Sequence, residues 1–137
     1  MSGNCVLCEQ DGGEIVWSNA LARVVNVNDD DHPGFCRVIL QRHVREMTDL
    51  PDSERSDLMR IVFAVEQVQR KLLSPEKINL ASFGNMVAHV HWHVIPRFRS
   101  DPHYPAPVWG NRKAGSALPL PDNYWQQFGD ELTRMLG

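Results

Sequence analysis

The segment His89-Val90-His91-Trp92-His93-Val94-Ile95-Pro96 decides the fold prediction, because three histidines alternate with apolar residues. In a β-strand, successive side chains point to opposite faces of the sheet. We therefore predict a strand over Ala88–Phe98, with the three histidines on one face and Val90, Trp92 and Val94 on the other. The apolar face is expected to pack into the core, so the histidine face holds the candidate functional residues.

Three interpretations of the histidine face compete. In the first, the rings lie on the solvated side of a half-buried sheet, although three in strict alternation is an unusual pattern for solvation alone. In the second, two neighbouring histidines bind a metal ion with a third ligand from elsewhere; the outer pair, about 13 Å apart, is too distant for one ion to bind all three. In the third, a neutral imidazole is a nucleophile and its neighbours donate hydrogen bonds to phosphate. Only the third interpretation uses all three positions.

Hydrophobic periodicity predicts the other elements. Apolar residues at steps of three and four predict a long amphipathic helix from Pro51 to about Leu73. A second helix is predicted over Tyr124–Leu136, after a Pro-rich coil from Pro102 to Pro121. The remaining predicted strands are Glu14–Ser18, Ala22–Asn28, Cys36–Leu40 and Lys77–Phe83. Strands in runs with single helices between them favour an α+β fold with an antiparallel sheet.

Composition limits the classes of function. The chain has 137 residues, with 14 Lys and Arg against 17 Asp and Glu, and a formal net charge of −3. This length favours one domain, and the negative charge argues against a general nucleic-acid binder, which needs a surplus of cations. The longest apolar run is far shorter than the roughly 20 residues that span a bilayer, and the first residues lack the pattern of a secretory signal. We therefore expect a cytoplasmic protein without a membrane segment.

The three cysteines cannot all pair, and nothing suggests export, so we expect no disulfide framework. Cys36 lies in an apolar run and is interpreted as a buried thiol. Cys5 and Cys8 form a C-x-x-C motif, but a redox pair of this kind normally opens a helix, and residues 9–13 lack a helical pattern. Half of a metal site is the interpretation that stays open, provided that the fold supplies two more ligands.

The histidine segment matches every position of the His-φ-His-φ-His-φ-φ signature, where φ is apolar, and the chain therefore resembles the histidine triad (HIT) family. The resemblance to the family covers residues from about Cys5 to Phe98. The tail through Trp109 resembles only a bacterial subgroup of hydrolase-like members. Further family features, in order, are the C-x-x-C, Pro33-Gly34, Leu40-Gln41-Arg42-His43, the helix after Asp49-Leu50-Pro51, Asn79, Gly84-Asn85 and Pro96-Arg97. The resemblance implies a HIT-like fold over 1–137. Its expected parts are a core at about 5–98 with an antiparallel sheet of about five strands and a long central helix, then a coil and C-terminal helix over 99–137.

The resemblance also implies a nucleotide hydrolase or transferase that acts at the α-phosphate of a nucleoside phosphate. The middle histidine, His91, would attack phosphorus and form a nucleotidyl-histidine intermediate, while His89 and His93 would donate hydrogen bonds or protonate the leaving group. The implied substrate is a dinucleoside polyphosphate or a nucleoside phosphoramidate. The alternatives are a metal-dependent hydrolase that uses a His-x-His pair and a non-catalytic nucleotide-binding module.

Four further residues are candidates for nucleotide or phosphate contacts. Backbone N–H groups at Gly84 and Asn85 are suited to a phosphate because glycine permits close approach to an anion. Asn79 resembles a family feature, and Asn28 lies near the position where family members carry a ribose-binding residue. One departure is Phe35, which replaces a fourth histidine common in the family and cannot donate a proton.

Some family branches hold a structural zinc with a C-x-x-C, a histidine after the apolar strand and the first triad histidine. Cys5, Cys8, His43 and His89 occupy those positions, and two thiolates with two imidazoles suit tetrahedral zinc. If zinc binds His89, that ring cannot also contact the phosphate. The chemistry itself requires no cofactor, and the family implies a homodimer.

Overall fold

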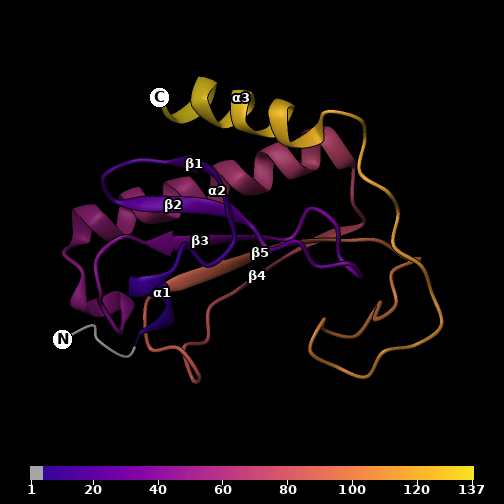
Figure 1. Cartoon of the computed structure of the whole chain (residues 1–137), viewed down its shortest axis with the longest axis horizontal. Coiled ribbons are helices and arrows are strands. Elements are labelled where there is room, and N and C mark those ends of the chain that lie inside the picture. The colour runs from indigo at the N-terminus through magenta and orange to yellow at the C-terminus, as the bar shows by residue number, and fades with distance from the viewer. Residues whose placement is uncertain (1–4) are drawn as a thin grey trace.

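The computed structural model describes residues 5–137 as an α+β fold built on one five-stranded antiparallel sheet (Figure 1). The strands are β1 (Glu14–Ser18), β2 (Ala22–Asn26), β3 (Cys36–Leu40), β4 (Lys77–Ala81) and β5 (His91–Arg97), in the order β1-β2-β3-β5-β4. The helices are α1 (Val6–Glu9), α2 (Asp52–Leu73) and α3 (Tyr124–Leu136), with a 3-10 turn, η1 (Met47–Asp49). The predicted fold class is confirmed, including the long helix and the C-terminal helix. Residues 1–4 lie outside the described residues. They begin the N-terminal segment in which the sequence predicts no secretory signal.

Helices α2 and α3 lie on the same side of the sheet (Figure 1). The side chains of β3 and β5 that face them, among them Val38 and Val94, belong to the main hydrophobic core. Val90 is also in this core and Trp92 packs against it, as the alternation in the sequence predicts. His91 and His93 therefore project from the sheet face that the two long helices do not cover.

Helix α2 forms where the periodicity predicts it. Its apolar stripe is buried against the sheet: Leu58, Ile61, Val62, Val65 and Val68. The helix begins after Pro51 and ends at Leu73; the next residue, Ser74, has a φ of 48° and donates its N–H to the Arg70 carbonyl at 3.1 Å. A left-handed residue at this position is a common helix C-terminus, and Pro75 cannot continue the helix.

Helix α3 buries Tyr124, Phe128 and Leu132 in the same core as α2. Each of these side chains is at most 2% exposed, so the C-terminal helix contributes apolar area that the sheet and α2 would otherwise leave open to water. The single domain over 1–137 stays a prediction, consistent with this shared core. No helix within residues 5–137 is long and apolar enough to cross a membrane.

Three predicted strands have different first or last residues in the structure. β5 begins at His91 rather than Ala88, because the chain bends before it: His89 donates its N–H to the Val87 carbonyl at 2.9 Å, and Val90 donates to the Val44 carbonyl at 2.8 Å. β2 ends at Asn26 rather than Asn28, and β4 at Ala81 rather than Phe83. The φ of Asn28 is 62°, and its N–H donates to the Asn26 side chain at 2.8 Å, a local turn that ends the strand.

Candidate active site

His91 opens strand β5 with a fixed ring orientation. Its Nδ1 lies 2.6 Å from the carbonyl oxygen of His89, and because a carbonyl only accepts, Nδ1 carries the proton. The lone pair of the ring is therefore on Nε2. Burial is the main cause that lowers the pKa of His91, and the nearby Arg37 cation lowers it further. His91 is thus a neutral imidazole near pH 7 with one nitrogen oriented by the backbone, which is the form a nucleophile requires.

His93 lies two residues further along the same face, with its ring centroid 5.1 Å from that of His91. The edge of Phe35 contacts it at 5.7 Å between centroids, and the rings of Phe83 and Trp109 lie at 6.1 and 5.2 Å. This surrounding shields the imidazole, and burial first, then His91 and Arg37, lowers the pKa of His93 to about 4. Its Nδ1 is buried and has no hydrogen-bond partner among the described residues.

Arg37 is a functional candidate that sequence reasoning missed. It lies in β3, directly opposite His93 in the antiparallel register, so its side chain projects from the same face as the two histidines. Its Nη1 donates to the Gly12 carbonyl at 3.1 Å, which anchors the guanidinium between the sheet and the N-terminal segment. Burial lowers the pKa of Arg37, but an arginine remains charged near neutral pH. A charge inside the apolar run Cys36–Leu40 was the signal in the sequence.

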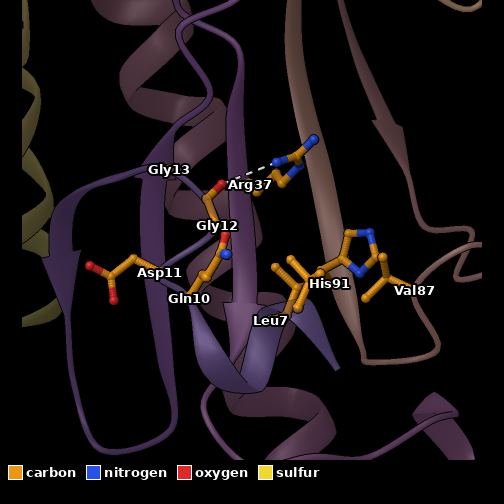
Figure 2. A pocket seen from close by; sticks show the side chains of 9 residues that line it. Leu7, Gln10, Asp11, Gly12, Gly13, Arg37, Val87 and His91 are labelled. Atoms are coloured by element: carbon orange, nitrogen blue, oxygen red, sulfur yellow. Dashed lines mark hydrogen bonds between the residues drawn. The ribbon is translucent and has the colours of Figure 1, made fainter. Parts of the chain in front are cut away.

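A cavity of about 560 Å³ lies beside His91. It is lined by Val6, Leu7, Gln10, Asp11, Gly12, Gly13, Arg37, Val87 and His91 (Figure 2). Leu7 and Val87 form its apolar part next to the His91 ring, while Arg37 lies on the side bounded by Gly12 and Gly13 (Figure 2). The size is within the range of small-molecule sites. The cavity therefore combines apolar walls with a cation and a neutral imidazole.

Two glycines allow the N-terminal segment to close over this face of the sheet. Gly12 and Gly13 have φ values of 80° and 152°, which favour glycine. A Cβ on Gly13 would lie 2.5 Å from the Asn26 carbonyl oxygen, and a Cβ on Gly12 would lie 2.7 Å from Ile39 Cδ1. Larger residues would push the segment away from the sheet and open the cavity wall.

His89 lies in a cluster with the two N-terminal cysteines. Its Nδ1 is 3.4 Å from the Sγ atoms of both Cys5 and Cys8, and Cys8 Sγ is 3.3 Å from His43 Nδ1. One donor atom from each of these four residues lies within 4.8 Å of the others. The Nε2 of His89 donates to the Leu40 carbonyl at 2.6 Å, so the ring presents its Nδ1 lone pair to the thiols. The set of donors fits tetrahedral zinc, and both nitrogens of His89 are engaged away from His91 Nε2.

The four predicted nucleotide contacts are not among the described residues that line the cavity at His91. The carbonyl oxygen of the Asn79 side chain accepts from Arg97 at 2.8 Å, and Asn28 is exposed and bonded to Asn26. Gly84 lines a separate cavity, of about 430 Å³, together with His89, and Asn85 is exposed. The connection that carries these two residues does reach the site, because Phe83 contacts His93 and Val87 lines the cavity at His91.

Two curated relatives match part of the chain. A bis(5'-nucleosyl)-tetraphosphatase (asymmetrical) from Schizosaccharomyces pombe is 40% identical over 74 residues, which cover 50% of this chain and 41% of that protein. An AP-4-A phosphorylase from Mycobacterium tuberculosis is 28% identical over 87 residues, which cover 59% of this chain and 45% of that protein. The matched segment thus spans less than half the length of each relative.

Solved structures match more of the chain. A histidine triad protein from Sinorhizobium meliloti is 29% identical with a TM-score of 0.71, covering 92% of this chain and 91% of that one. One from Bradyrhizobium japonicum is 25% identical with a TM-score of 0.71, covering 90% of each chain. A zinc-bound histidine triad family protein from Mycobacterium smegmatis is 18% identical with a TM-score of 0.67, covering 98% of this chain and 96% of that one, and it shares the fold. The HIT domain family model matches residues 10–100, which include the triad and the five strands, and the chain belongs to the HIT family.

Proposed function

We propose that this chain is a nucleotide hydrolase or transferase that acts at the α-phosphate of a nucleoside phosphate, with His91 as nucleophile. The observation that carries the proposal is the state of the His91 ring: neutral, with Nδ1–H donating to the His89 carbonyl and Nε2 left for attack, beside a cavity that also holds Arg37. The activities named for the two curated relatives, both on dinucleoside tetraphosphates, support the same chemistry.

The reaction proceeds in two displacements. The Nε2 lone pair of His91 attacks the α-phosphorus, a P–N bond forms, and the bond from phosphorus to the leaving group breaks with its electrons on that group. Water then attacks the same phosphorus, the P–N bond breaks with its electrons returning to Nε2, and the nucleoside monophosphate is released with a proton. Transfer to another acceptor in place of water gives the transferase reaction.

Arg37 supplies the positive charge for this reaction. Charge builds on the non-bridging phosphoryl oxygens in each displacement, and fixed donors near those oxygens lower the barrier. The guanidinium is oriented by its bond to the Gly12 carbonyl and shares the cavity with His91. The nucleoside occupies the apolar part of the cavity beside Leu7 and Val87. Backbone contacts from Gly84 and Asn85 to phosphate, and contacts from Asn28 and Asn79 to the nucleotide, stay predictions.

His93 contacts the leaving group in this proposal. In the ligand-free protein its ring is neutral, because the pKa is about 4. Binding a polyphosphate places negative charge beside the ring, which raises its pKa and favours the protonated form. The proton then passes to the leaving group as its bond to phosphorus breaks. Phe35, which contacts the His93 ring, cannot perform this step.

We further propose that Cys5, Cys8, His43 and His89 bind a structural zinc ion. When bound, zinc would join the N-terminal segment to the end of β3 and the start of β5, and so hold the cavity wall in place. This assignment gives His89 a structural role rather than a contact to phosphate. The alternative of a metal-dependent hydrolase loses support, because among the described residues His91 and His93 belong to no group of three or more potential metal ligands.

We also propose that the chain forms a homodimer. Strand β4 lies at the edge of the sheet, so its outer backbone groups are open to pairing with another strand. Multi-angle light scattering of the purified protein measures the mass directly. A mass near 15.6 kDa would contradict the dimer, whereas twice that mass is expected.

The nucleophile is tested with His91→Gly. We expect turnover of a panel comprising a dinucleoside tetraphosphate, adenosine phosphoramidate and a uridylyl sugar to fall by at least about 1000-fold, because the variant has no group that forms the intermediate. Free imidazole, which fits the space left by the ring, is expected to restore part of the rate. Mass spectrometry of the wild-type protein, kept at neutral or alkaline pH because the P–N bond is acid-labile, should locate a nucleotidyl group on His91. Wild-type rates in the folded variant would refute the assignment, and a wild-type protein that binds nucleotide without turnover would favour the non-catalytic alternative.

A further inference from the structure

Two large aromatic side chains lie exposed beside the histidine pair. Phe83, in the connection between β4 and β5, is 59% exposed, and Trp109, in the Pro-rich tail, is 53% exposed. Their rings contact each other at 4.8 Å with an interplanar angle of 89°. Both also contact the ring of His93. We call Phe83 and Trp109 the aromatic corner.

The tail that carries Trp109 is held by a buried ion pair. Arg97 donates from Nε and Nη2 to both carboxylate oxygens of Asp101, at 2.9 and 3.1 Å, and its Nη2 also donates to the Ala106 carbonyl at 2.8 Å. The side chains of this pair are each only 3% exposed. Beyond Ala106, the N–H of Gly110 donates to the Pro107 carbonyl at 2.9 Å in a turn around Trp109. An exposed tryptophan is thus kept at a defined place by an anchored backbone.

The aromatic corner does not contact His91 directly; the ring of His93 lies between them. The centroid distances from His91 to His93 and from His93 to Trp109 are both about 5 Å, so the Trp109 ring lies within about 10 Å of the nucleophile. Neither Phe83 nor Trp109 lines the cavity at His91 among the described residues. The cavity at His91 and the aromatic corner are therefore separate sites. In the proposed function, the reacting phosphate lies between them.

We propose that the aromatic corner binds the aromatic base of the leaving group, so that the preferred substrate class is a dinucleoside polyphosphate. This rests on the proposed function, in which one nucleoside occupies the cavity and His93 contacts the leaving group. A polyphosphate chain extends over a distance of this order, and its second base reaches the corner. One face of the base stacks on one ring while its edge meets the perpendicular second ring, a favourable geometry for aromatic groups.

Binding measurements test the corner apart from turnover. The probes are methylene-bridged, non-hydrolysable analogues of diadenosine tetraphosphate and of adenosine 5'-tetraphosphate, which differ only in the second nucleoside. We expect the wild type to bind the first at least about 10-fold more tightly, since stacking one base on an aromatic side chain is worth about 1–3 kcal/mol. Trp109→Leu and Phe83→Leu should each reduce this preference several-fold, and Trp109→Phe should retain most of it. Phe63→Leu, which changes a similarly exposed ring on α2, should leave the preference as in the wild type.

Two results would overturn the inference: equal binding of the two analogues by the wild type, or equal weakening of both in Trp109→Leu, which would indicate a role in packing against His93. Turnover of unmodified diadenosine tetraphosphate is measured in parallel and tests the proposed function. A preserved preference without turnover would refute only the hydrolase assignment. Turnover without a binding preference for the diadenosine analogue would refute only the proposed role of the aromatic corner.

Discussion

The buried, neutral ring of His93 predicts a specific loss of stability in acid. Its pKa is about 4 in the folded protein, against an ordinary value of 6.5. Between these pH values the unfolded chain takes up a proton at this residue and the folded chain does not. The free energy of unfolding therefore falls as the pH is lowered from about 6.5 towards 4, and it is unaffected by this group above about pH 7.5. At about 1.4 kcal/mol per pH unit, the total contribution is on the order of 3 kcal/mol.

The measurement is urea unfolding of the wild type and of His93→Asn at intervals from pH 7.5 to 5.0, followed by tryptophan fluorescence. The difference between the two proteins isolates His93, because every other titratable side chain is present in both. The wild type is expected to lose about 2 kcal/mol more than the variant over this range. Ile78→Val, a buried substitution without a titratable group, provides the control, and its cost should not depend on pH.

Parallel pH curves for the wild type and His93→Asn would refute this reasoning, as would an NMR titration that gives His93 an ordinary pKa. Phe35→Ala supplies a further check on the cause. This substitution removes the ring that contacts His93, admits water, and is expected to raise the pKa of His93. An unchanged pKa in that variant would show that Phe35 does not contribute to the shielding.

Three further predictions concern charge, metal and packing. Arg37→Met is expected to lower kcat by about 100-fold in steady-state assays, because the phosphoryl oxygens lose their fixed cation, and Arg37→Lys should recover part of the loss. Equal rates in the wild type and both variants would contradict the proposed role of Arg37. Cys8→Ser, or removal of metal by a chelator, should lower the Tm and the zinc content measured by elemental analysis, and a Tm insensitive to both would contradict the structural zinc. Leu132→Ala should cost about 2–5 kcal/mol in urea unfolding, because its side chain is fully buried between α3 and the rest of the core; a cost below about 1 kcal/mol would show that α3 unfolds separately.

The alternation of the histidine segment predicts the orientation of β5 in the sheet because it satisfies two constraints at once. Trp92 and Val94 must face the core that α2 and α3 cover, which sends His91 and His93 to the open face. The same rule misplaces His89, since alternation assumes that the strand continues. The bend that turns His89 towards the cysteines depends on hydrogen bonds to Val44 and Val87, and these come from pairing between distant segments that periodicity does not report.

The candidate site was harder to predict where it depends on register. Arg37 reaches the histidines only because β3 pairs with β5 so that Arg37 lies opposite His93. A shift of one residue would send the guanidinium into the core, and nothing local in Cys36–Leu40 fixes that register. Trp109 presents the same difficulty, because its place depends on the long-range contacts of the tail. Residues whose positions follow from local pattern were predictable, and those whose positions depend on tertiary pairing were not.

In the proposed function, Phe35 and Arg37 together account for how the site would bind phosphate without the fourth histidine common in the family. Phe35 contacts His93, and burial holds the pKa of that ring far below neutrality, so the imidazoles alone supply no positive charge to the ligand-free site. Arg37, two residues away in β3, supplies a charge that does not titrate in the physiological range. In that proposal, this division of roles keeps His91 neutral for nucleophilic attack while the phosphate contacts the Arg37 cation. The proposal thus lets a chain of net charge −3 bind a phosphate locally, because Arg37 would place a fixed cation beside His91.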